Sequence, residues 1–152
     1  MPHPPARFTL TRQRDPTLAL GKCVALAASQ PAFARQPFGP LVSMLAGQVT
    51  RRHYLLVARD GKLGGLIGWA FCTEEQGLRW LADGRGERTG DGLGGDCVML
   101  NCWISDGPDM TRFVTGELRR LFADRRALFA KRHYADGRER PLVLRNPKLR
   151  AG

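Results

Sequence analysis

Residues 53–70, HYLLVARDGKLGGLIGWA, are the most informative stretch of this sequence. An apolar run over 54–58 precedes Asp60-Gly61, and a second apolar run over 63–69 follows it. Asp-Gly supplies the positive-φ residues that a tight hairpin turn requires, so the stretch predicts two antiparallel strands. Residues 96–105, DCVMLNCWIS, predict a third strand of the same sheet.

Helices and loops are expected to pack against this sheet. Asp15 and Pro16 are typical of a helix start and predict a helix over 16–29. Three prolines between 31 and 40 argue against regular structure there. We expect the side chains of Phe33 and Phe38 to pack into the core and hold that loop in place. The other expected elements are a short helix over 41–48, a short strand or helical turn over 73–82, a glycine-rich connector over 83–95, a helix over 110–123 capped by Asp109, a second helix over 124–134, a turn over 135–140 and a strand over 141–145.

The composition predicts one globular domain over residues 16–152, preceded by a flexible arm over 1–15. No apolar run approaches the roughly 20 residues that span a bilayer, and the N-terminal residues lack the apolar core of a signal peptide. The four cysteines form no C-x-x-C pair and only three histidines are present, so the spacing predicts no metal site. We expect reduced thiols and a cytoplasmic location.

The net charge of +10 and the isoelectric point near 10.5 are unusual. Such a charge favours an acidic partner: nucleic acid, a membrane surface or an acidic carrier protein. Codon usage that enriches arginine is the alternative explanation. The positive charge is concentrated between residues 112 and 150, where only Glu117, Asp124, Asp136 and Glu139 oppose it.

The order of these segments resembles that of the toxin-activating lysine acyltransferases, which attach fatty acyl groups to internal lysines of RTX protoxins. The resemblance covers roughly residues 18–146, and the individual motifs are short. The matching residues are Leu20-Gly21, Ala28-Ser29 with Pro31, Tyr54-Leu55-Leu56 with Arg59-Asp60, Trp69-Ala70, Gly95-Asp96, Trp103-Ile104, Arg119-Arg120 with Phe122, and the region of Phe129 and Arg132.

This resemblance implies an α/β sandwich of the GNAT-like acyltransferase fold, with a mainly antiparallel central sheet flanked by helices. It implies an acyl carrier protein as the acyl donor, in preference to acyl-coenzyme A, and a lysine of a protein or peptide as the acceptor. An RTX-type protoxin and a ribosomal precursor peptide are both compatible acceptors. Carrier or substrate binding is expected at Arg119, Arg120, Arg132, Trp69 and Trp103, with no bound cofactor. A homodimer is compatible with these features.

Two departures from the family pattern concern its catalytic pair. The family's catalytic histidine falls at Phe33, and its partner aspartate falls at Cys102. Phenylalanine cannot accept a proton, so the general-base step cannot run through position 33. We expect His53 to lie at the surface and His133 to be exposed within its basic run.

Three interpretations of the altered site stay open. In the first, Cys102 is a nucleophile or proton donor, assisted by Asp96 or His53. In the second, the enzyme relies on positioning its substrates. In the third, the domain binds a carrier protein or peptide without catalysis. A different class of function, a nucleic-acid-binding module that uses the C-terminal arginines, is permitted by the charge.

Overall fold

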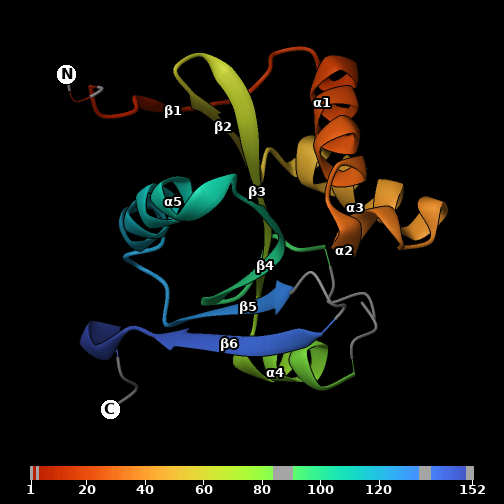
Figure 1. Cartoon of the computed structure of the whole chain (residues 1–152). Helices are drawn as coiled ribbons and strands as arrows, with labels where there is room; N and C mark the ends of the chain where they lie inside the picture. The colour runs from red at the N-terminus through yellow and green to blue at the C-terminus, as the bar shows by residue number, and fades with distance from the viewer. Residues whose placement is uncertain (1, 3, 84–90, 134–137, 150–152) are drawn as a thin grey trace.

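The computed structural model describes residues 2, 4–83, 91–133 and 138–149. The strands in these residues form one sheet in the order β1-β2-β3-β4-β5-β6. All neighbours are antiparallel except β4 and β5, which are parallel. Helices α1, α2 and α3 lie on one side of the sheet and α5 lies on the other (Figure 1). The fold is therefore α/β, as predicted, and none of the helices in the described ranges is long and apolar enough to cross a membrane.

The predicted hairpin is confirmed. Strand β2 (Tyr54–Arg59) and strand β3 (Lys62–Cys72) join through Asp60 and Gly61, whose φ angles are 50° and 81°. The Asp60 side chain also accepts a hydrogen bond of 2.9 Å from the Arg7 backbone N–H. This contact anchors β1 (Phe8–Thr11), which pairs with β2. Residues 8–11 of the expected flexible arm are therefore a strand, because the open edge of β2 offers them backbone partners.

Helix α1 (Pro16–Ala28) agrees with its prediction, and Asp15 accepts hydrogen bonds from the backbone N–H groups of the first turn. The prediction of an irregular stretch over 31–40 is wrong. Helix α2 (Pro31–Ala34) and helix α3 (Phe38–Arg51) occupy most of it, and α3 is longer than the expected 41–48. Pro31 and Pro40 stand in first helical turns, where the missing N–H has no helical partner to lose. Phe33 is 3% exposed, as expected for a core plug, but Phe38 is 75% exposed.

Helix α4 (Glu74–Asp83) replaces the expected short strand or turn. Thr73 and Gln76 form a capping box, in which each side chain accepts a hydrogen bond from the other residue's backbone N–H. Helix α5 (Gly107–Leu121) begins three residues before the expected start. Asp109 therefore lies in its first turn and not at its cap, and it pairs with Arg59 at 2.7 Å.

The helix expected over 124–134 is a strand, β5 (Ala127–His133). It pairs in parallel with β4 (Cys97–Ile104) and antiparallel with β6 (Glu139–Arg145). Residues 127–130 are all buried, so both faces of this segment are covered. The sequence of a strand that is covered on both faces is a short continuous apolar run. Hydrophobic periodicity alone cannot distinguish such a run from a buried helical segment. The expected turn over 135–140 lies largely outside the described residues, while the strand over 141–145 is confirmed within β6.

Candidate functional site

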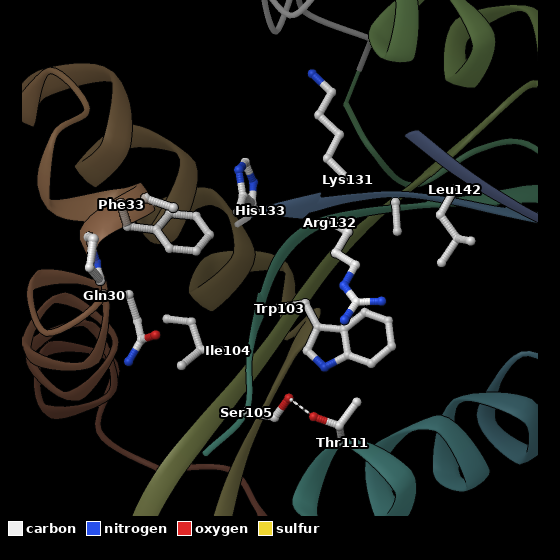
Figure 2. A pocket seen from close by; sticks show the side chains of 13 residues that line it. Gln30, Phe33, Trp103, Ile104, Ser105, Thr111, Lys131, Arg132, His133 and Leu142 are labelled. Atoms are coloured by element: carbon white, nitrogen blue, oxygen red, sulfur yellow. Dashed lines mark hydrogen bonds between the residues drawn. The ribbon is translucent and has the colours of Figure 1, made fainter. Parts of the chain in front are cut away.

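A cleft opens where β4 and β5 separate. The two strands pair through residues 97–100 and 127–130 only. Beyond that point Trp103 and Ile104 pair with β3, and residues 131–133 pair with β6. The cleft has a volume of about 500 Å³ and is shown in Figure 2. Its walls come from α2, α5 and the ends of β4, β5 and β6: Gln30, Pro31, Ala32, Phe33, Trp103, Ile104, Ser105, Thr111, Ala130, Lys131, Arg132, His133 and Leu142.

The cleft has walls from both sides of the sheet. Phe33 belongs to the core layer under α1–α3, whereas Trp103 packs against the core layer under α5. Successive side chains of a strand point to opposite faces. His133 accordingly lies beside Phe33 of α2, and Arg132 extends toward Trp103 on the α5 side, while the Lys131 side chain extends away from both (Figure 2). The cleft therefore joins residues of both core layers at the point where β4 and β5 separate.

The ionisable side chains that line the cleft are all basic or neutral: Lys131, Arg132 and His133. The Lys131 ammonium lies 4.4 Å from the centre of the Trp80 ring, and burial lowers the pKa of Lys131. Arg132, which the resemblance assigns to donor binding, is at the cleft, and so is Trp103. The ionisable lining is therefore basic, which suits an anionic substrate.

His133 is the cleft residue that the sequence analysis placed wrongly. Its side chain is 21% exposed, not fully exposed, and its Nδ1 lies 3.4 Å from Glu139 Oε1. Its ring contacts the Phe33 ring edge-on, with 5.5 Å between the centroids. The β5–β6 register places His133 directly opposite Glu139. Sequence gives no sign of this pair unless residues 124–134 are recognised as a strand.

The N-terminus of α5 adjoins the cleft through Thr111. Asp106 and Asp109 lie at that terminus, and Arg59 bonds both Asp109 carboxylate oxygens at 2.9 and 2.7 Å. Ser105 and Thr111 share a hydrogen bond of 2.9 Å, and Thr111 also donates to the Gly107 carbonyl. A helix N-terminus attracts anions through its unpaired N–H groups and its dipole. Here Asp106 adds a negative charge at the terminus, whereas the charge of Asp109 is balanced by Arg59, so the terminus attracts a pyrophosphate less than a helix end without Asp106 would.

Cys102 lies beside the cleft but within the core. It is 1% exposed and belongs to the same buried cluster as Phe33 and Cys23. The structure thus brings together the two positions where the family's catalytic pair would fall. Burial, and next the proximity of Cys23, raise the pKa of the Cys102 thiol strongly. Burial also raises the pKa of Cys23 to about 11 and that of Cys72 to about 12.

Three other predicted residues lie away from the cleft. Asp96 precedes β4 at the opposite, closed end of the β4–β5 pair, where it binds Arg126 at 3.1 Å. Arg126 also lies 3.7 Å from Glu74, and Glu74 in turn bonds Arg145. Arg119 and Arg120 are exposed in the last turn of α5. Within the described residues, no cluster of three or more candidate ligands could hold a metal ion.

Trp69 and His53 form a separate aromatic group beneath the C-terminal end of α5. Trp69 is 3% exposed and meets Phe122 edge-on, so it does not reach the cleft. His53 stacks on Trp69 and contacts Phe71 edge-on, and its Nδ1 is buried without a hydrogen-bond partner among the described residues. His53 is therefore half-buried, and not a freely exposed surface residue as expected, because its ring packs against two aromatic side chains.

Protonation of His53 is expected to destabilise the fold. Burial, and then the charges of Arg51, Arg12 and Arg125, lower the pKa of His53 from its ordinary value of 6.5. The unfolded chain therefore binds this proton more readily than the folded chain, and stability falls as the pH drops below about 6.5. Thermal unfolding measured from pH 7.5 to pH 5 should show this loss, and His53→Phe should reduce it while keeping the ring contacts. An equal pH dependence in both proteins would contradict this assignment.

Solved structures with this fold include three acyltransferase-like proteins. The loading GNATL domain of CurA from Lyngbya majuscula has a TM-score of 0.61 and 13% identity, covering 86% of this chain and 68% of that one. The GphF GNAT-like decarboxylase in complex with isobutyryl-CoA has a TM-score of 0.56 and 18% identity, covering 86% and 67%. An agmatine N-acetyltransferase has a TM-score of 0.53 and 11% identity, covering 85% and 77%.

These similarities establish a GNAT-like fold, which confirms the fold that the sequence resemblance implied. No family model matches the sequence, and no curated protein matches it significantly. Membership of the toxin-activating lysine acyltransferases is therefore not confirmed and stays a prediction.

Proposed function

We propose that this protein transfers an acyl group from a thioester to an amine within the β4–β5 cleft. The observation that carries the proposal is the separation of two parallel strands into a cleft with walls on both faces of the sheet. Ligands of open α/β sheets bind beyond the carboxyl ends of their strands. A thioester that enters from the α5 side would meet an amine that enters from the α2 side, and holding both in line supplies much of the rate enhancement.

The donor we favour is an acyl group carried by an acyl carrier protein. Lys131 and Arg132 at the cleft, and the basic C-terminal third, suit an acidic partner that carries its acyl group on a phosphopantetheine arm. Asp106 at the start of α5, beside an Asp109 whose charge Arg59 balances, disfavours the pyrophosphate of coenzyme A. Acyl-coenzyme A is nevertheless a donor to test, since GphF is described in complex with isobutyryl-CoA.

The acceptor we favour is the side-chain amine of a lysine in a protein or peptide. This choice follows from the sequence resemblance to enzymes that acylate lysines. Phe33 and Ile104 give the α2 side of the cleft an apolar wall, along which a lysine's methylene chain could extend with its amine at the strand junction. The chain length of the acyl group is left to experiment.

The proposal is tested by incubating the protein with a donor and an acceptor and measuring the acyl mass shift. Donors would be acyl carrier proteins loaded with acyl groups of several lengths, and the matching acyl-coenzyme A thioesters. Acceptors would be a lysine peptide and the same peptide with its lysine acetylated. Transfer to the free lysine alone supports the proposal. Tight carrier binding without transfer to any acceptor would overturn it and favour a non-catalytic binding domain.

Cys102→Ala is expected to leave kcat/KM within about twofold of the wild-type value. The thiol is buried and its pKa is raised, so it holds little of the thiolate that a thioester intermediate requires. Steady-state kinetics of the variant, after circular dichroism has shown that it is folded, provide the measurement. A loss of more than tenfold, together with an acylated Cys102 in the wild type, would instead support a thioester route.

A further inference from the structure

We propose that His133 is the general base of this acyl transfer and that Glu139 orients it. The inference rests on the proposed function and assigns the proton-accepting residue that its chemistry requires. A lysine amine is mostly protonated at neutral pH, and its nitrogen must also lose a proton as the amide forms. A side chain at the reaction site that accepts this proton can raise the rate by about 10²- to 10⁴-fold.

The His133–Glu139 pair has the geometry of an oriented base. Nδ1 of His133 faces the Glu139 carboxylate at 3.4 Å, which favours the tautomer with its proton on Nδ1. Nε2 is then the nitrogen that can accept a proton. The two residues face each other across neighbouring strands of the sheet, so the backbone register and not a mobile loop sets their separation. Rigid elements hold catalytic groups more accurately than loops do.

The Phe33 contact connects this histidine with the altered catalytic pair. The family's histidine falls at Phe33, on α2, where no proton can be accepted. The Phe33 ring packs edge-on against the His133 ring, with 5.5 Å between the centroids. An imidazole is therefore present at the same end of the same cleft, but it comes from β5. In our proposal the base has moved from one wall of the cleft to the facing wall, and Phe33 has become its packing surface.

Charged groups lie near His133 on β5 and on β6. Glu139 faces it from β6, and Lys131 lies on the same face of β5 two residues away. Arg132 extends to the opposite face (Figure 2), and α2 contributes Pro31, Ala32, Phe33 and Ala34, which are not ionisable. The negative Glu139 would also stabilise the imidazolium that forms when the proton is taken.

The lysine enters the step as its neutral amine, after its ammonium proton has passed to solvent. The amine nitrogen attacks the thioester carbonyl, the new C–N bond forms, and one N–H proton passes to His133 Nε2. The C–S bond then breaks and the electron pair leaves on sulfur. The proton on the imidazolium passes to that thiolate, which leaves as a thiol, and His133 is neutral again. The products are an amide and the free carrier thiol.

His133→Gln is expected to lower kcat/KM by about 10²-fold or more, with little change in carrier affinity measured by calorimetry. The matched control is His53→Gln, which removes a histidine that lies away from the cleft and should leave transfer unchanged. Glu139→Gln should lower the rate less, because Nε2 is still present but less well oriented.

Chemical rescue separates a catalytic role from a structural one. His133→Ala leaves space beside Phe33, and added imidazole should restore part of the lost rate in proportion to its concentration. His53→Ala should not respond to imidazole. If the wild type transfers acyl groups but His133→Gln is equally active with an unchanged pH profile, this inference is wrong and the proposed function stands. If the wild type transfers nothing, both fail together.

Discussion

Thr111→Trp is expected to reduce acyl transfer by about 100-fold or more. Thr111 is an exposed residue on α5 that lines the α5 side of the cleft beside Ser105. An indole at this position would occupy space that the donor's arm needs within a cleft of about 500 Å³. A misplacement of about 1 Å at the reacting atoms can cost about 10²-fold in rate, and a blocked cleft should cost at least that. Single-turnover transfer from the loaded carrier is the measurement.

Gly116→Trp is the matched control for the blocked cleft. Gly116 lies on the same helix but does not line the cleft, and a Cβ atom built there would meet nothing within 4 Å. This variant should transfer acyl groups at close to the wild-type rate. Equal activity of the two tryptophan variants would mean that the donor does not use the α5 side of the cleft.

Gly77→Ala is expected to destabilise the fold, although alanine is the better helix former. Gly77 lies within α4, and a Cβ atom there would come within 2.3 Å of the Phe129 ring. Phe129 is fully buried, so its ring cannot move aside freely. Overpacking of this kind costs about 1–3 kcal/mol, more than the roughly 1 kcal/mol gained by replacing a helical glycine. Chemical denaturation should report a lower free energy of unfolding.

Gly116→Ala in α5 shows the effect of the same exchange without the clash. Because a Cβ at Gly116 has open space around it, the free energy of unfolding of this variant should be higher than that of the wild type by up to about 1 kcal/mol. Adding Phe129→Leu should reduce the cost of Gly77→Ala, since the smaller side chain frees space over the glycine. Additive effects of these two substitutions would contradict the proposed contact.

The elements that could be predicted from sequence have local signals. Asp60-Gly61 determines a hairpin by its own turn chemistry, and Asp15-Pro16 starts a helix by its own capping. Strand β5 lacks such a signal, because its four buried residues become strand-like only when β4 and β6 cover both edges. The prolines at 31 and 40 misled for a related reason, since a proline's effect depends on whether it stands in the first turn or the middle of a helix.

Two residues proposed from the sequence, Arg132 and Trp103, line the cleft, and positions 33 and 102 belong to one buried cluster. The roles proposed for these residues stay predictions. His133 was missed because its role depends on a strand register that joins it to Glu139. A carboxylate that opens a strand can lie at either end of a parallel pair, so the sequence could not place Asp96 relative to the cleft. It is held by Arg126 at the closed end of the β4–β5 pair.

The short β4–β5 pairing leaves the two strands joined at one end and separated at the other. Backbone pairing between the two strands is confined to residues 97–100 and 127–130, and Arg126 pins the closed end through Asp96 and Glu74. A small rotation of β5 and β6 together, about the paired residues 97–100 and 127–130, would widen the cleft and leave the β3–β4 and β5–β6 pairings intact. The thickness of the acyl chain that the protein accepts would then depend on how far β4 and β5 separate. An engineered disulfide between the separated ends of the two strands should narrow the range of acyl donors that the protein accepts.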